Sequence, residues 1–225
     1  MPHDPPVLDS LPHLSGHHGD FDAFAQLMQQ TAPGRFGPLW WGVWDQYVAP
    51  NLPVSARIAD LGCGPGGLLP GLRERHPGAQ LHAVELQPAM LRHLRPLADQ
   101  LNVQVAESDL AHPLPFPDSF LDAAIAVMVL HEMPNPLTLL AEVWRTLRPG
   151  GSFLVYDWAR QPLEAYAEGK PLSAELLQHF REHCLYTPED LAFLARSAGF
   201  VVQEVIGRRG NGYAMLALRR PAEAP

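Results

Sequence analysis

The chain has 225 residues, of which 47% are hydrophobic, so it is long enough for one compact domain with a sizeable core and leaves little room for a second. Sixteen basic against 24 acidic residues leave a net charge of -8, which disfavours a nucleic-acid partner. The chain has only two cysteines, no run of about 18 apolar residues and no signal-peptide pattern. These features predict a cytoplasmic protein with no membrane partner.

The N-terminal part of the chain divides into an arm and a helical segment. Residues 1–19 are rich in Pro, His and Gly without apolar periodicity, which indicates a flexible arm. Phe21, Phe24 and Met28 recur at helical spacing, and the patch PLWWGVWDQYV follows. We therefore predict helices over residues 20–50.

After these helices, strand patterns alternate with amphipathic helix patterns. The expected strands are ARIADL, QLHAVEL, NVQVAES, FLDAAIAVMVL, SFLVYDW, VVQEVI and YAMLALRR. The expected helices are GLLPGLRERH, PAMLRHLRPLADQL, NPLTLLAEVWRT and TPEDLAFLARSAGF. Such alternation predicts an α/β fold, with right-handed crossovers and a parallel sheet that has helices on both faces. This domain spans residues 51–220 and is followed by a tail at 221–225.

A glycine-rich loop, ADLGCGPGG at residues 59–67, follows the first strand pattern. In a sheet of this kind, ligands bind at the carboxyl ends of the strands, where chain order reverses. Glu85 ends the second strand pattern, where a carboxylate can accept both hydroxyls of a ribose, and Asp109 follows the third, where it can accept an adenine amine. The pattern predicts an adenosine-containing cofactor. A nicotinamide dinucleotide remains an alternative on this evidence, because GCGPGG also satisfies G-x-G-x-x-G.

Longer motifs resemble those of the class I S-adenosylmethionine-dependent methyltransferases. They are ADLGCGPGG with Glu85, SDLAHPLPFPDSFLDAAIAVMVLHEM and RTLRPGGSFLVYD, within a resemblance over roughly residues 58–218. The resemblance implies a Rossmann-like, doubly wound sheet of seven strands in the order 3-2-1-4-5-7-6, mostly parallel with the last strand antiparallel. It also implies S-adenosylmethionine as the cofactor and a small molecule as the methyl acceptor. Both a monomer and a homodimer remain open from the sequence.

The resemblance assigns cofactor-binding roles to residues at the strand ends. Asp60 and the loop backbone would face the methionine part, Glu85 the ribose, and Asp109 the adenine edge. The complete set is Asp60, Gly62, Cys63, Gly64, Gly66, Glu85, Leu86, Asp109, Leu110 and Val127. The absence of Lys or Arg between residues 59 and 72 agrees, because a pyrophosphate usually has cationic help there.

The candidate catalytic residues are His131, Tyr156 and Asp157, which end the fourth and fifth strand patterns. His131 is a candidate general base, or a polar strand-end residue that bonds a loop carbonyl. Asp157 could take a proton or cap the next segment. Trp40 and Trp44 lie on one helix face, where they could form an aromatic wall against the acceptor or pack in the core.

Two further spacings have rival interpretations. Tyr166 and Lys170 have the Tyr-x-x-x-Lys spacing of short-chain dehydrogenases, but YAEGKP has a Gly and a following Pro that weaken a helix. His179 and His183, followed by Cys184, suggest a metal site. Two ligands on one helical turn are more typical of a solvated face, so we predict no metal.

The predicted reaction is an in-line displacement at the sulfonium methyl, which requires few obligatory catalytic residues. Residues 20–50 are expected to form a lid, and 160–186 a cap segment, over the carboxyl edge of the sheet. The acceptor would bind between them and the cofactor. An alternative is a regulatory module that binds the cofactor without catalysis.

Overall fold

The structure is a computed structural model. The residues that it describes are 20–133, 135–160, 162, 173, 174, 177, 186–208 and 212–222.

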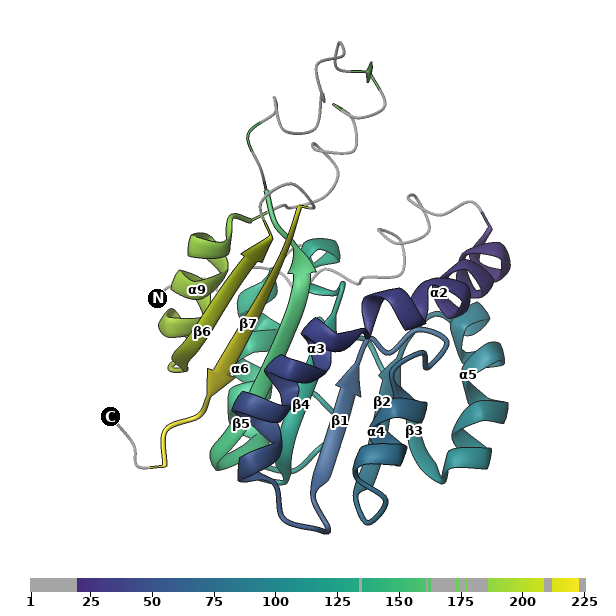
Figure 1. The fold of residues 1–225 in the computed structure, drawn as a ribbon, viewed down its shortest axis with the longest axis horizontal. Coiled ribbons are helices and arrows are strands. Elements are labelled where there is room, and N and C mark those ends of the chain that lie inside the picture. The colour runs from purple at the N-terminus through teal and green to yellow at the C-terminus, as the bar shows by residue number, and fades with distance from the viewer. Residues whose placement is uncertain are drawn as a thin grey trace.

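A sheet of seven strands in the order β3-β2-β1-β4-β5-β7-β6 forms the centre of the molecule (Figure 1). The strands are β1 (Arg57–Leu61), β2 (Gln80–Glu85), β3 (Val103–Glu107), β4 (Leu121–Val127), β5 (Leu147–Trp158), β6 (Val201–Arg208) and β7 (Tyr213–Arg219). Only β7 runs antiparallel to its neighbours, β5 and β6, and the remaining pairs are parallel. The predicted fold class and strand order are confirmed.

The helices that cross between strands begin where the sequence provides a start signal. Proline lies in the first turn of α4 (Leu69–Arg75), α5 (Pro88–Leu101), α6 (Pro136–Thr146) and α9 (Pro188–Ser197). Proline is tolerated there because the first helical N–H groups have no partner within the helix. The Thr187 side chain caps α9 in addition. Local sequence therefore determines where these helices begin.

Helices cover both faces of the sheet. On one face, α4 and α5 pack beside α3 (Pro38–Val43) and the π-helical turn that continues it (Trp44–Val48), against Ile125 and other sheet residues. On the other face, α6 and α9 pack through Leu140 and Leu191. The strands are buried on both sides, as a parallel sheet requires. The prediction of helices on both faces is confirmed.

The segment expected to form a lid, residues 20–50, divides into two parts with different positions. Helix α2 (Phe21–Arg35) lies at the carboxyl edge of the sheet, but α3 and the turn after it run along the sheet face (Figure 1). Trp40 and Trp44 are 1% and 0% exposed in that face, and the Trp44 indole donates to Nε2 of His76. This corrects the aromatic-wall interpretation, because both tryptophans are core residues.

Several predictions fall outside the described residues. They concern the arm 1–19, the Tyr166 and Lys170 pair, the group His179, His183 and Cys184, most of the cap segment 160–186, and the end of the tail 221–225.

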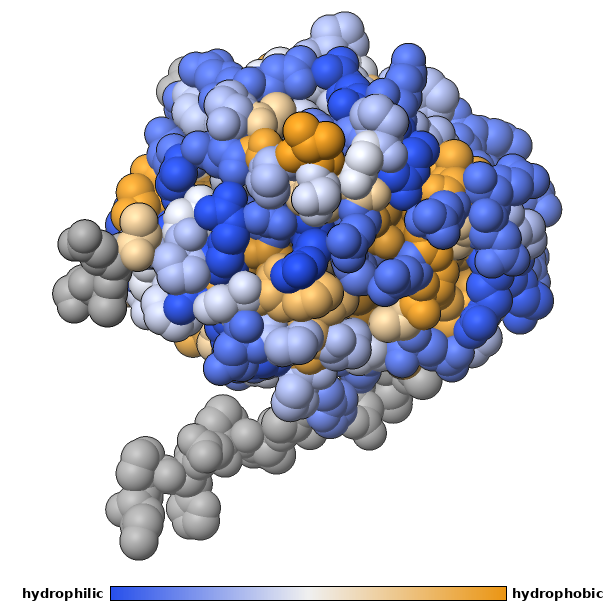
Figure 2. Space-filling view, turned by 90° about the horizontal axis from the view of Figure 1, so that it is seen from below, coloured by the Kyte–Doolittle hydropathy of each residue, from blue (hydrophilic) through white to orange (hydrophobic). Residues whose placement is uncertain are grey.

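The amino edge of the sheet is seen from below in Figure 2, and it is mostly hydrophilic with separate apolar patches. The turn before β1 belongs to this edge, and its Val54 is the most exposed large apolar residue of the described chain. Across the described residues, no helix combines the length and the apolar character that a membrane crossing needs.

Candidate functional site

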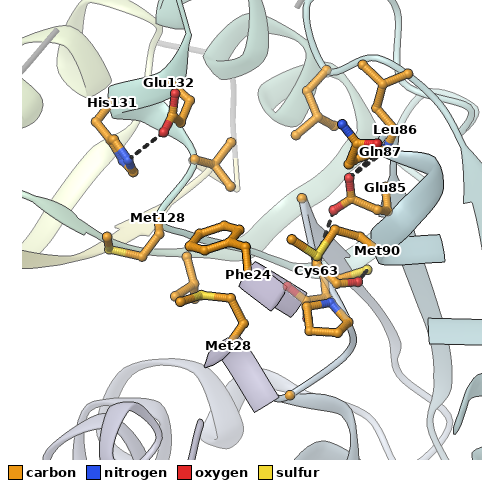
Figure 3. Close-up of a pocket in the computed structure, with 18 of the residues that line it drawn as sticks. Phe24, Met28, Cys63, Glu85, Leu86, Gln87, Met90, Met128, His131 and Glu132 are labelled. Atoms are coloured by element: carbon orange, nitrogen blue, oxygen red, sulfur yellow. Dashed lines mark hydrogen bonds and ion pairs between the residues drawn. The ribbon is translucent and has the colours of Figure 1, made fainter. Parts of the chain in front are cut away.

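A cavity of about 370 Å³ opens at the carboxyl edge of the sheet (Figure 3). Its walls are the glycine loop after β1, the ends of β2 and β4, helix α2, and the neighbouring ends of β5 and β7. Every predicted cofactor residue except Gly66 lines it: Asp60, Gly62, Cys63, Gly64, Glu85, Leu86, Asp109, Leu110 and Val127. Residues from three separate crossover loops thus meet in one cavity.

Glycine is required at three positions of the loop for different structural reasons. Gly62 and Gly64 have φ of 67° and 57°, which disfavours residues with a side chain. A Cβ on Gly62 would also lie 2.7 Å from Cγ2 of Val129, in the loop after β4. At Gly66, a Cβ would meet Leu94 of α5 at 2.8 Å. Gly66 therefore allows close packing of the loop on α5, and its predicted cofactor-binding role stays a prediction.

Glu85 ties the end of β2 to the glycine loop. One of its carboxylate oxygens accepts the N–H of Gly64, and the other accepts those of Leu86 and Gln87, each at 2.8 Å. Burial raises the pKa of Glu85, and these three backbone N–H groups act in the opposite direction. The side chain is thereby fixed at the cavity wall, in the position expected of a ribose acceptor.

Two groups beside Glu85, the buried Asp60 and the half-buried Cys63, have raised pKa values. Asp60 is 4% exposed, and burial together with the charge of Glu85 raises its pKa to about 7. Burial also raises the pKa of the Cys63 thiol, which therefore stays protonated at neutral pH and is a poor nucleophile. The negative charge on Asp60 is costly in this environment, so a cationic ligand would favour its ionised form.

Asp109 lies in the turn after β3. Its Oδ1 accepts the N–H of Ala111 at 2.9 Å, and the preceding Ser108 donates its N–H to the Glu85 carbonyl at 3.1 Å. These bonds hold the ends of β2 and β3 together. The carboxylates of Glu85 and Asp109 consequently line the same part of the cavity wall.

His131 lies between two carboxylates. Its Nδ1 is 2.7 Å from Oδ1 of Asp157, and its Nε2 is 3.3 Å from Oε1 of Glu132. Burial alone would lower the pKa of His131, but the two carboxylates raise it to about 10. At neutral pH the side chain is an imidazolium that donates from both nitrogens. A general base must accept a proton, so this environment does not favour that role for His131, and its place among the catalytic residues stays a prediction.

Asp157 and Tyr156 do not line the cavity. Asp157 is 0% exposed, and its oxygens accept the N–H groups of Val129, Leu130 and Trp158 as well as the His131 side chain. It therefore holds the loop after β4, a role that neither interpretation of Asp157 named. Tyr156 points to the α3 face, where its ring contacts Trp40 and Tyr213 with centroid separations of 6.2 and 5.4 Å. Neither residue is among those that line the cavity, and their assignment as catalytic groups stays a prediction.

Helix α2 belongs to the segment predicted as a lid, and it contributes a wall whose residues were not singled out from the sequence as site residues. Phe24 and Met28 project into the cavity between Cys63 and Met128 (Figure 3), and Phe21 lines it as well. Their helical spacing was visible in the sequence. What it could not show is which surface they cover, because that depends on where α2 crosses the sheet edge.

Arg35, at the end of α2, was also missed. Its Nη2 donates to Sδ of Met28 at 3.3 Å and to Oγ1 of Thr31 at 2.9 Å, and it lines the cavity. Within the described part of the chain, no carboxylate pairs with its guanidinium. Burial lowers the pKa of Arg35 only from a very high value, so the side chain stays charged. The cavity therefore contains a cation without an acidic partner among these residues.

The fold is that of an α/β protein with a ligand-sized cavity at the carboxyl edge of its sheet, and known proteins identify the family. The model of the methyltransferase domain matches residues 59–155. The ubiquinone biosynthesis O-methyltransferase of Xanthomonas campestris is 32% identical over 208 residues, which are 85% of this chain and 84% of that enzyme. The demethylmenaquinone methyltransferase of Thermus thermophilus is 36% identical over 112 residues, and that match spans about half of each chain. The chain therefore belongs to the S-adenosylmethionine-dependent methyltransferase family.

Solved structures agree on the fold. Phosphoethanolamine N-methyltransferase 2 of Haemonchus contortus, in complex with S-adenosylmethionine, superposes with a TM-score of 0.73 at 14% identity, over 95% of this chain and 60% of that one. A methyltransferase from Aquifex aeolicus gives 0.59 at 20% identity, over 85% and 97%. The protein is a methyltransferase, and its cofactor is S-adenosylmethionine.

Proposed function

We propose that the cavity binds S-adenosylmethionine with its adenosine toward Glu85 and Asp109 and its methionine part along the glycine loop. A small-molecule acceptor would bind beyond the methyl group, beneath α2. The observation that carries this proposal is the position of Glu85, whose carboxylate is held at the cavity wall by three backbone N–H groups, one of them from the loop itself.

The charges of the cavity fit this cofactor, which carries an ammonium, a sulfonium and a carboxylate but no phosphate. The carboxylates of Asp60, Glu85 and Asp109 suit its cationic and hydrogen-bond-donating groups. Arg35 would bind the methionine carboxylate, because it is a cation at the cavity with no carboxylate partner in the described chain. A dinucleotide fits less well, since the loop itself has no Lys or Arg between residues 59 and 72, Arg35 is a single cation at the cavity, and three carboxylates would face a pyrophosphate.

The acceptor is proposed to be an apolar molecule that contains a ring. Phe21, Phe24 and Met28 of α2 line the cavity together with Met133 and Trp158, so apolar and aromatic groups would enclose the acceptor. Two relatives named above are enzymes of ubiquinone and menaquinone chemistry, and an apolar ring suits such a wall.

The cofactor supplies an activated methyl group, and the residues of the chain hold the acceptor in position to receive it. The loops after β1 and β4 hold one side of the reacting pair, and α2 holds the other and keeps water out. Holding the acceptor atom roughly 3 Å from the methyl carbon, in line with the breaking bond, provides much of the rate enhancement. In this proposal α2 is the part of residues 20–50 that forms the lid, since the segment after it packs on the sheet face.

Isothermal titration with S-adenosylmethionine, S-adenosylhomocysteine, NAD and NADP tests the proposed site. We expect micromolar affinity for the first two and no comparable binding of the dinucleotides. Heat from the dinucleotides alone would overturn the proposal. Binding without methyl transfer to any metabolite pool would favour the regulatory-module alternative.

A further inference from the structure

Glu132 lies at the end of the cavity opposite Glu85. Figure 3 shows Glu132 and His131 on one side, Glu85 on the other, and Phe24 between them. Glu132 ends the short helix Leu130–Glu132 that follows β4, and its side chain lines the cavity at 15% exposure. If Glu85 marks the ribose, Glu132 lies toward the acceptor.

A series of buried groups fixes the Glu132 carboxylate. The amides of Val129 and Leu130 bind Asp157 at 3.0 and 2.7 Å, Asp157 binds Nδ1 of His131 at 2.7 Å, and Nε2 of His131 reaches Oε1 of Glu132 at 3.3 Å. Because Asp157 ends β5 and Glu132 follows β4, this series connects two strand ends. A carboxylate held in this way keeps its place at low entropic cost.

The other ionisable groups near this end of the cavity have different tasks. Both nitrogens of His131 are engaged by carboxylates, and Asp157 is fully buried. Arg35 is a cation and has no proton-accepting role. Among the described residues that line the acceptor end, Glu132 is therefore the carboxylate in position to meet an acceptor.

We propose that Glu132 is a catalytic residue that accepts a hydrogen bond from a hydroxyl or amine of the methyl acceptor and then takes its proton, with His131 as a positioning residue. This proposal rests on the proposed function. The acceptor oxygen or nitrogen forms the new bond to the methyl carbon, the electron pair of the broken C–S bond stays on sulfur, and the O–H or N–H proton passes to the Glu132 carboxylate. The acceptor class is thus an apolar molecule with a protic heteroatom.

Sinefungin tests this without knowledge of the acceptor, because it carries an amine at the position of the transferable methyl. Sinefungin and S-adenosylhomocysteine are each titrated into the wild-type protein and into Glu132→Gln. Sinefungin places an amine where the transferable methyl would be, and S-adenosylhomocysteine has no group there. We expect Glu132→Gln to lose at least about tenfold in sinefungin affinity, since a charge-assisted hydrogen bond is removed, and to keep its affinity for S-adenosylhomocysteine within about twofold.

Two further variants complete the experiment. Glu74→Gln is the matched control, because Glu74 is exposed on α4 and does not line the cavity. It should retain the wild-type ratio of sinefungin affinity to S-adenosylhomocysteine affinity. His131→Gln should lower the ratio by a smaller factor than Glu132→Gln. An unchanged ratio in His131→Gln would remove the positioning role.

The outcomes separate the two proposals. If the wild-type protein does not bind S-adenosylhomocysteine, the proposed cofactor site is wrong and the role of Glu132 falls with it. If it binds, and Glu132→Gln changes neither affinity or both equally, the role of Glu132 alone is refuted. A selective loss of sinefungin affinity supports it.

Discussion

Arg35→Met tests how the chain recognises the charged end of its cofactor. Methionine keeps an unbranched apolar stem of similar packing character but removes the guanidinium. The variant therefore asks whether the cation, and not the packing of α2, determines affinity. S-adenosylhomocysteine has a methionine-type carboxylate, and 5′-methylthioadenosine has the same adenosine and sulfur without it.

The size of the effect follows from the surroundings of Arg35. Its Nη2 already donates to Met28 and Thr31. Within the described chain no carboxylate binds its other N–H groups, so they can bind the carboxylate of the ligand. A hydrogen bond to a charged group contributes about 1.5–3 kcal/mol. We expect Arg35→Met to weaken S-adenosylhomocysteine binding by roughly 10- to 100-fold, and to leave 5′-methylthioadenosine binding within about twofold.

Isothermal titration of both ligands measures this difference, with Arg196→Met on the exposed surface of α9 as the control. Removing Arg35 should not lower thermal stability, because burial disfavours its charge and no carboxylate among the described residues offsets that cost. An equal loss of affinity for the two ligands would refute the reasoning, since the carboxylate would then have no separate partner at Arg35.

Three other variants probe the loop, the ribose end and the imidazolium. Gly62→Ala and Gly64→Ala both place a side chain at a positive φ, which costs about 1 kcal/mol, but only at Gly62 would the new Cβ meet Val129, at 2.7 Å. Urea unfolding should therefore show a larger loss in the free energy of unfolding for Gly62→Ala. Equal losses in the two variants would contradict the packing argument. Glu85→Ala should weaken S-adenosylhomocysteine binding by about 1–3 kcal/mol in titrations, because a charged acceptor is lost, and unchanged affinity would exclude a ligand contact. The folded-state pKa of His131, about 10, lies above its ordinary value of 6.5, so its stabilisation is fully present below 6.5 and is lost as pH rises through 10; urea unfolding between pH 6 and 10 should show this fall, and His131→Gln should reduce it. An identical pH dependence in that variant would show that the ion pairs do not stabilise the fold.

Prediction from sequence worked where the signal is local and the fold is repetitive. Glu85 and Asp109 end consecutive strand patterns, and parallel strands bring their carboxyl ends to one edge. The residues therefore meet in the cavity without any need to know the packing of helices. The loop glycines follow the same logic, because a turn with φ near 60° favours glycine wherever it occurs.

Prediction was weaker where a residue had two compatible environments. Trp40 and Trp44 satisfy a helical period either at a ligand wall or in the core, and only the path of α3 along the sheet face decides between them. Gly66 lies within the motif, yet it packs on Leu94 of α5. Helical spacing put Phe24 on an apolar face but could not say what that face covers.

The sequence by itself determined the order of elements, the loop after β1 and the carboxylates at the ends of β2 and β3, because short-range patterns and sheet topology suffice for these. The tertiary structure decided the charge and role of His131. Its state depends on Asp157, which ends a different strand, and on their shared burial, which makes the interaction of the charges strong. No spacing in the chain encodes a distance of 2.7 Å between a side chain after β4 and one in β5. That distance, set by packing, makes His131 an imidazolium and leaves Glu132 at the cavity.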